Sequence, residues 1–193
     1  MTAIAGTDAS GDGELVAFAR DVTGPFLRVR WRQSLQGQAV RGLAVADITG
    51  DGRPDLVVGT RTGPASGALE LWRNDGTAGR VAFTRIRSLP LEGIPCAVLA
   101  VDLGGTPGPD VVVGLRDNDA GRGGRAMVFF CDARTLPSRG SDPSAGRLLG
   151  WVPALVSGAF DTGVRPRGAA ASPGFAAGVH PASGGGSVFV FVR

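Results

Sequence analysis

The segment from Asp47 to Asp55 contains the residues whose types and spacing are best suited to chemistry. It reads DITGDGRPD, with oxygen-bearing side chains at its first, third, fifth and ninth positions and a glycine at the sixth that permits a tight reversal. Ca²⁺ is a hard cation that takes about six to eight oxygen ligands. A loop that turns back on itself can present these oxygens to one centre. We therefore predict a calcium site formed by the side chains of Asp47, Thr49, Asp51 and Asp55 and the carbonyl of Arg53.

Two other interpretations of this segment differ in what holds the loop. An EF-hand is disfavoured because Val58 stands where a bidentate glutamate is needed, and because the flanking segments have strand composition. A turn rich in Asp and Gly that keeps the same shape without metal is the alternative that stays open. The three carboxylates favour the calcium interpretation, since they would repel one another in the absence of a cation.

Two related loops follow along the chain with fewer oxygen side chains. The first keeps both end carboxylates, Asp102 and Asp110, but has glycine and threonine at its third and fifth positions. We expect this degenerate second metal loop to bind metal weakly or not at all. The loop that begins at Asp161 has lost the other carboxylates, and we expect Arg165 to pair with Asp161 in place of a cation.

The loops lie between short apolar runs that recur roughly every 54 residues. The runs LVVGT at 56–60 and GALELWRND at 67–75 have an earlier counterpart in AIAGT and GELVAFARD, and DVVVG at 110–114 repeats the first of them. Runs of this length, rich in Val, Leu, Phe and Trp and bounded by Gly, Pro and Asp, are typical of strands. In the second repeat we predict strands at about 41–46, 55–60, 67–73 and 81–88. The apolar run at 43–46 is expected to be covered on both faces.

One four-stranded antiparallel sheet per repeat is the blade of a β-propeller, so we predict an all-β fold made of such blades. Strands are expected in groups of three, four, four and three, about three and a half blades. Closed propellers have about four to eight blades, so we expect this ring to be completed by more polypeptide or another subunit. A self-contained small propeller with a misassigned terminal blade is the alternative. The chain is then one propeller domain, 1–193, with units at about 1–36, 37–90, 91–153 and 154–193.

Composition excludes several other classes. The chain has 32 Gly and 13 Pro among 193 residues, all 20 cationic residues are Arg, and the 17 anionic residues are mostly Asp. Gly, Pro and Asp disfavour helix interiors, so a helical bundle is excluded. No apolar run reaches the roughly 18 residues of a membrane helix. The N-terminus lacks a basic start followed by a long apolar stretch, so we do not expect it to be a secretion signal; the protein is then either cytoplasmic, or the sequence is a mature or partial product.

The segment from Val45 to Gly59 resembles the FG-GAP/VCBS repeat family, whose blades also occur in integrin α-subunit propellers. The resemblance implies a propeller with Ca²⁺ in the loop between the first two strands of a blade. It also implies an extracellular or periplasmic role in adhesion, recognition or scaffolding. Thr49 stands where the family usually has Asp or Asn, and Gly42-Leu43 replaces the Phe-Gly element.

These observations predict a non-enzymatic, calcium-stabilised propeller module that recognises proteins or glycans, or a scaffold subunit of a larger extracytoplasmic complex. We expect protein subunits or surface glycans as partners, no direct membrane insertion, and no nucleic acid, because the arginines are scattered without interleaved aromatic residues. Chelation is expected to lower the melting temperature. The alternative is a fragment of a propeller-type carbohydrate-active enzyme that resembles polysaccharide lyases. No catalytic motif surrounds the single histidine, His180.

Aromatic and acidic residues outside the loops have structural interpretations. Trp31, Trp72 and Trp151 recur late in their units, so we expect them on third or fourth strands, packed between blades. The Asp117-Asn118-Asp119 cluster is interpreted as a solvated turn; a second cation site or an acidic recognition loop is the alternative.

Overall fold

The structure of the chain is a computed structural model, and it describes residues 2–8, 12–20, 24, 27–104, 108–120, 123–131, 150–160, 172–181 and 187–192. Within these ranges every regular element is a β-strand, so the all-β prediction is confirmed. None of the described residues belongs to a helix that could cross a membrane.

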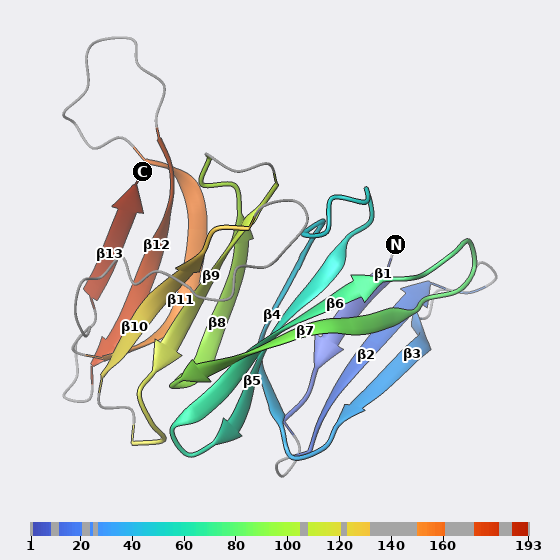
Figure 1. The fold of residues 1–193 in the computed structure, drawn as a ribbon, viewed down its shortest axis with the longest axis horizontal. Helices are drawn as coiled ribbons and strands as arrows, with labels where there is room; N and C mark the ends of the chain where they lie inside the picture. Colours follow the sequence, from blue (N-terminus) through green and yellow to red (C-terminus); the bar gives the residue numbers. More distant parts are fainter. Residues whose placement is uncertain are drawn as a thin grey trace.

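The strands form four antiparallel sheets that follow one another along the chain (Figure 1). Sheet 1 contains β1 (Thr2–Gly6), β2 (Gly13–Arg20) and β3 (Leu27–Leu35). Sheet 2 contains β4 (Ala39–Ala46), β5 (Asp55–Gly63), β6 (Ser66–Asn74) and β7 (Phe83–Glu92). Sheet 3 contains β8 (Ile94–Val101), β9 (Asp110–Arg116) and β10 (Gly124–Phe129). Sheet 4 contains β11 (Gly150–Phe160), β12 (Ser172–Pro181) and β13 (Ser187–Val192).

In each sheet, strands that follow one another in sequence are hydrogen-bonded neighbours, as in the blades of a propeller. The sheets stand in an open row, from β1–β3 at one end to β11–β13 at the other (Figure 1). The four strands predicted for the second repeat are confirmed as β4 to β7, with ends that differ by a few residues. The three strands predicted for the first unit are confirmed as β1 to β3.

One strand assignment in the third unit was wrong. The run around Trp151, expected late in that unit, is the start of β11, which pairs with β12 in sheet 4. An apolar run identifies a strand but does not show which neighbour it pairs with, because that choice depends on contacts distant in sequence. Sheet 3 therefore has three strands among the described residues, and residues 132–149 lie outside them.

Apolar side chains fill the space between successive sheets. The cluster between sheets 1 and 2 includes Leu15, Leu56 and Trp72, and the one between sheets 2 and 3 includes Val57 and Val113. Strand β5 therefore alternates, with Leu56 facing sheet 1 and Val57 facing sheet 3. A third cluster joins sheets 3 and 4. Each fully buried aliphatic side chain of this kind contributes about 1.5–3 kcal/mol of burial.

The first strand of sheet 2 is covered less completely than predicted. Leu43 packs toward sheet 1, and Ala44 and Ala46 pack toward the cluster shared with sheet 3. Val45, however, is 52% exposed, so the expectation that the run at 43–46 is covered on both faces was wrong at this residue. Val45 is exposed because it lines a groove between sheets 1 and 2.

Two glycines one repeat apart set the distance between successive sheets. A Cβ atom built on Gly59 of β5 would lie 2.8 Å from Cβ of Pro95 on β8. One built on Gly114 of β9 would lie 2.7 Å from the carbonyl oxygen of Val152 on β11. Any other residue would force the next sheet away at these positions.

Irregularities in strand pairing also follow the repeat. On the first strands of sheets 2 and 3, the extra residues of two β-bulges are Arg41 and Cys96. On the last strands of sheets 1 and 2, the pairing skips Arg30 and Ile86. Because the bulges recur at matching places, they are part of the repeated unit.

Candidate functional site

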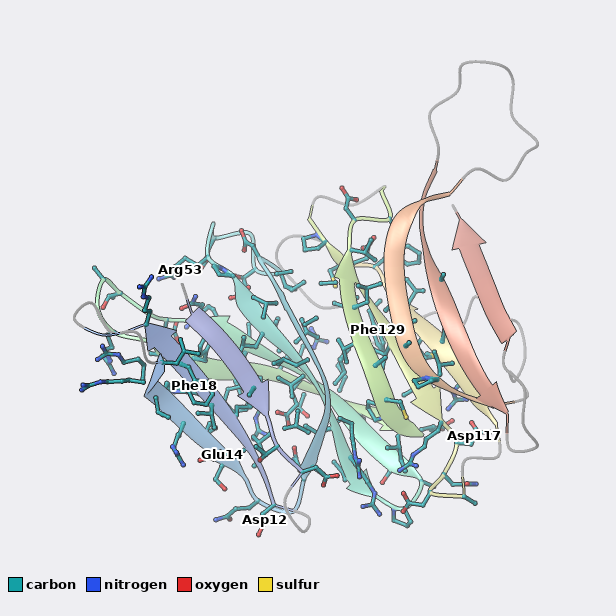
Figure 2. All side chains as sticks on the ribbon, turned by 180° about the vertical axis from the view of Figure 1, so that it is seen from behind. Asp12, Glu14, Phe18, Arg53, Asp117 and Phe129 are labelled. Carbon is teal, nitrogen blue, oxygen red and sulfur yellow. The ribbon has the colours of Figure 1, made fainter. Side chains whose placement is uncertain are left out.

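The Asp47–Asp55 loop connects β4 to β5 at one end of sheet 2. Its backbone turns at two glycines with positive φ, Gly50 at 70° and Gly52 at 82°. Gly52 is the sixth residue of the loop, where the sequence predicts a tight reversal. Figure 2 shows Arg53 of this loop near one end of the strands and Asp117 near the other.

The last carboxylate of the loop, Asp55, is fully buried and serves as an internal acceptor. Its Oδ2 accepts hydrogen bonds from the Ile48 amide at 3.1 Å, and from the amide and hydroxyl of Thr49 at 2.9 Å each. Its Oδ1 accepts from the Asn74 amide at 2.9 Å, at the end of β6. Four donors fill the acceptor capacity of one carboxylate. Asp55 therefore ties the start of the loop to the end of a neighbouring strand.

The first carboxylate, Asp47, accepts hydrogen bonds from the amides at the centre of the loop. Its Oδ1 lies 3.1 Å from the Asp51 amide, and its Oδ2 lies 2.8 Å from the Gly52 amide. Side chains of this kind hold turns closed by satisfying backbone donors. Asp47 therefore fixes the reversal at Gly52.

The middle carboxylate, Asp51, pairs with an arginine of the same loop. Its Oδ2 accepts from Arg53 Nη2 at 2.8 Å and from Arg53 Nε at 3.2 Å, and its Oδ1 accepts from the Arg53 amide at 2.9 Å. The side-chain hydrogen bond from Arg53 is the main cause that lowers the pKa of Asp51, and the same bond raises the pKa of Arg53. Arg53 also reaches the Gly76 carbonyl, at 3.4 Å.

These contacts test whether the loop fits calcium. The residue types are those that Ca²⁺ prefers, but Asp55 is filled by four donors and Asp51 is held by a guanidinium. Among the described residues, which include the whole loop, no three Asp, Glu, His or Cys side chains gather as a metal ligand set. The arrangement does not fit a bound cation as it stands. Calcium binding stays a prediction from the sequence.

The loop from Asp102 to Asp110 repeats the anchoring contacts. Asp110 is fully buried, and its carboxylate accepts from the Leu103 amide at 3.2 Å and the Cys131 amide at 3.0 Å. These partners correspond to Ile48 and Asn74 of the first loop. Asp102 accepts from the Gly104 amide at 2.8 Å. Residues 105–107, with Thr106, lie outside the described residues, as does the loop that begins at Asp161.

Two structural interpretations from the sequence have a clear outcome. Trp31 on β3 lies edge-on to Trp72 on β6, with ring centroids 6.1 Å apart, so these residues pack between sheets as predicted. Trp72 also donates to Glu70, at 2.9 Å. In the acidic cluster, Asp119 bridges Arg61 of sheet 2 at 2.6 Å and Arg116 of sheet 3 at 2.8 Å. That carboxylate links two sheets, which the interpretation as a solvated turn did not include.

A groove between sheets 1 and 2 was missed by the sequence analysis. It has a volume of about 570 Å³, and its lining includes four arginines: Arg20, Arg30, Arg53 and Arg80. No Asp or Glu is among its lining residues. The four arginines come from distant segments, so no local pattern in the sequence reveals them as a group. We call this feature the arginine groove.

Comparison with known families identifies the central part of the chain. Residues 47–113 match the family model of the FG-GAP-like repeat. The match begins at the Asp47 loop and extends through sheet 2 to β9. Among curated proteins, no match to the chain was found.

Proposed function

The chain carries an FG-GAP-like repeat, and on this premise we propose that it is a non-enzymatic β-propeller module. It recognises protein subunits or surface glycans, or holds such partners together in a larger assembly. The main support for this proposal is that the loop carboxylates are engaged within the protein and are not free to act on a substrate. Asp55 and Asp110 are buried and engaged by backbone amides, and Asp51 is paired with Arg53. These groups shape the ends of the sheets, where a partner can bind.

The same observation supports recognition over catalysis. A general acid or base must be able to reach a substrate and exchange its proton with it. Glu70 is also fully buried, and its carboxylate accepts from Trp72 and forms an ion pair with Arg85 at 2.9 Å. Its oxygens are thus committed between β6 and β7.

An array of glycans followed by an assay for cleavage tests the proposal. The chain is first incubated with immobilised polysaccharides, and every polysaccharide that binds is then followed for unsaturated sugar ends. Binding without product supports the recognition module. Formation of unsaturated ends would overturn it in favour of a lyase-like enzyme.

Light scattering after size exclusion addresses the scaffold form of the proposal. In a mixture with candidate partner proteins, the expected result is a complex of defined mass that contains this chain.

The localisation is a separate part of the proposal: as the resemblance to FG-GAP/VCBS proteins implies, we place the chain in the extracellular or periplasmic space. Fractionation of cells that express the native gene measures this directly, and recovery only in the cytoplasm would contradict it.

Calcium binding to the Asp47 loop would require some of its side chains to give up their present hydrogen-bond and ion-pair partners. Asp51 would have to release Arg53 and turn toward the ion, together with Asp47 and the Arg53 carbonyl. Calorimetric titration with Ca²⁺ measures whether this exchange takes place. Heat of binding that disappears in Asp51→Asn would support the exchange.

A further inference from the structure

The arginine groove lies between sheets 1 and 2, beside the Asp47 loop and the β6–β7 connection. Its cationic side chains come from four places: the end of β2 for Arg20, β3 for Arg30, the β4–β5 loop for Arg53, and the β6–β7 connection for Arg80. A volume of about 570 Å³ is in the range of pockets that bind ligands. Four arginines around one groove, three of them without a paired carboxylate among the described residues, make it complementary to an anion.

Three of these arginines are available to a ligand. Arg20, Arg30 and Arg80 are exposed, and none of them has a carboxylate partner among the described residues. Arg53 is the exception, since it already pairs with Asp51. Guanidinium groups are suited to carboxylates because their planar forks form two parallel hydrogen bonds.

The backbone holds two of these arginines in place. Arg30 is the extra residue of the β3 bulge, between the pairs Phe18–Val29 and Ala17–Trp31, and a bulge turns its extra side chain away from the regular alternation. Arg80 closes a tight turn in which Thr77 and Arg80 exchange backbone hydrogen bonds of 3.0 and 2.9 Å. The bulge and the turn therefore set where these two side chains leave the backbone.

The apolar part of the groove narrows the class of ligand. It is lined by aliphatic residues, including Ile4, Val81 and the 52% exposed Val45. Its one aromatic residue, Phe83, already packs edge-on against Trp31, with ring centroids 5.2 Å apart. Exposed apolar surface bordered by polar residues is typical of protein–protein contact sites, so it suits the apolar side chains of a peptide.

We propose that the arginine groove binds an acidic peptide segment of a partner protein, with its carboxylates on Arg20, Arg30 and Arg80 and its apolar side chains against Val45 and Val81. This inference rests on the proposed recognition function and gives it a site and a ligand class. The electrostatic attraction also accelerates association, and it weakens as salt is added.

Fluorescence anisotropy with three labelled probes tests the inference on the full chain. The probes are a peptide of alternating Glu and Leu, a matched peptide of alternating Gln and Leu, and an oligogalacturonate. We expect saturable, salt-sensitive binding of the Glu-Leu peptide, with the other two probes at least about tenfold weaker. Tighter binding of the oligogalacturonate would overturn the peptide assignment in favour of an acidic glycan.

A matched pair of double variants locates the binding. Arg30→Gln with Arg80→Gln removes two groove charges, and Arg32→Gln with Arg87→Gln removes two charges from β3 and β7 outside the groove lining. The groove variant is expected to weaken binding of the Glu-Leu peptide at least about tenfold, and the control less than about twofold. Equal losses would show attraction to net charge alone and overturn the site. Circular dichroism and the melting temperature establish that both variants are folded.

Nuclear magnetic resonance provides a readout that does not depend on the variants. Addition of the Glu-Leu peptide is expected to shift the amide signals of Gly76 and Thr77, which line the groove. Shifts confined to other residues would overturn the site, although another binding surface would leave the recognition function standing. If the chain binds none of the probes but forms a complex with a partner in light scattering, this inference fails and the proposed function survives.

Discussion

The Asp47–Asp55 and Asp102–Asp110 loops lie one repeat apart. Both end in a buried aspartate, which we call the anchor, and they differ in the residues between their two end aspartates. Asp55 and Asp110 are both fully buried, and each joins an amide at the start of its loop to an amide at or just beyond the end of the strand that follows its own. The first loop adds Thr49, Asp51 and Arg53, for which the second has glycine, threonine and glycine at the third, fifth and seventh positions. The ninth-position aspartate therefore belongs to the fold, and the interior is the part that can vary with function.

Removal of the anchors is expected to have the largest effect. Asp55→Ala and Asp110→Ala each leave buried amides without acceptors, so each should lower the free energy of unfolding by about 3 kcal/mol. Urea denaturation measures both losses. Asp51→Ala is the control, because Asp51 is exposed. If Asp55 were mainly a calcium ligand, its loss would vanish in EDTA while that of Asp110→Ala persisted.

The glycines that turn the loops come next. Gly52 has a φ of 82° and Gly104 a φ of 81°, and a Cβ atom at either position would meet no atom within 4 Å. Alanine at these positions therefore introduces backbone strain without a steric clash. Each variant is expected to lose about 1 kcal/mol, measured by thermal or urea unfolding. A loss confined to Gly52→Ala would show that the second loop tolerates a different backbone conformation.

Thr49 tests a contact that the second loop lacks. Thr49→Val keeps the shape of the side chain but removes the hydroxyl that donates to Asp55 at 2.9 Å. The expected loss is about 1 kcal/mol, because the other donors to Asp55 remain. Thr62→Val, at an exposed hydroxyl of the same sheet, is the control. An unchanged free energy of unfolding would mean that the three backbone amides alone satisfy the Asp55 carboxylate.

Calcium is expected to produce a smaller effect than these substitutions. Because Asp51 is held by Arg53 and Asp55 is filled, the melting temperature of the wild-type chain should change little between EDTA and millimolar Ca²⁺. In Arg53→Gln the Asp51 carboxylate is released, so a stabilising shift with Ca²⁺ should appear or increase. A large shift in the wild-type chain would mean that the ion displaces Arg53, and would support the calcium site predicted from the sequence.

The smallest expected effect is a change in the pKa of Asp51. The side-chain hydrogen bond from Arg53 lowers the pKa of Asp51 below its ordinary value of 3.8. A carboxyl group whose pKa is lower in the folded state stabilises that state fully above its unfolded value, and this stabilisation is lost as the pH falls through the folded value. The carboxyl carbon shift of Asp51 should therefore titrate below 3.8 in the wild type and move upward in Arg53→Gln. Titration at the same pH in both proteins would contradict the pairing.

Local patterns predicted the strands of sheet 2, since β4 to β6 are largely apolar runs near Gly, Pro and Asp and β7 repeats the composition of β3. The loop between β4 and β5 could also be placed, because its glycines and aspartates have the spacing of a tight reversal. The pairing of β11 could not, because Trp151 belongs to a strand whose partner follows it at Ser172–Pro181.

The interaction partners of the charged residues could not be predicted from the sequence either. One of the four donors that engage Asp55 is the Asn74 amide, which is nineteen positions away. Arg20, Arg30 and Arg80 share a groove only because two sheets pack together. Scattered charges were therefore interpreted as unrelated, although the packing of the sheets gathers them.

The bulges at Arg41 and Cys96 have a consequence for how homologous chains are compared. An inserted residue reverses which face the following side chains occupy, so residues of equal parity on either side of it face opposite ways. Alternation of apolar and polar residues must be counted afresh from each of these positions. An alignment that closes either bulge with a gap would exchange the two faces of the rest of that strand, β4 or β8.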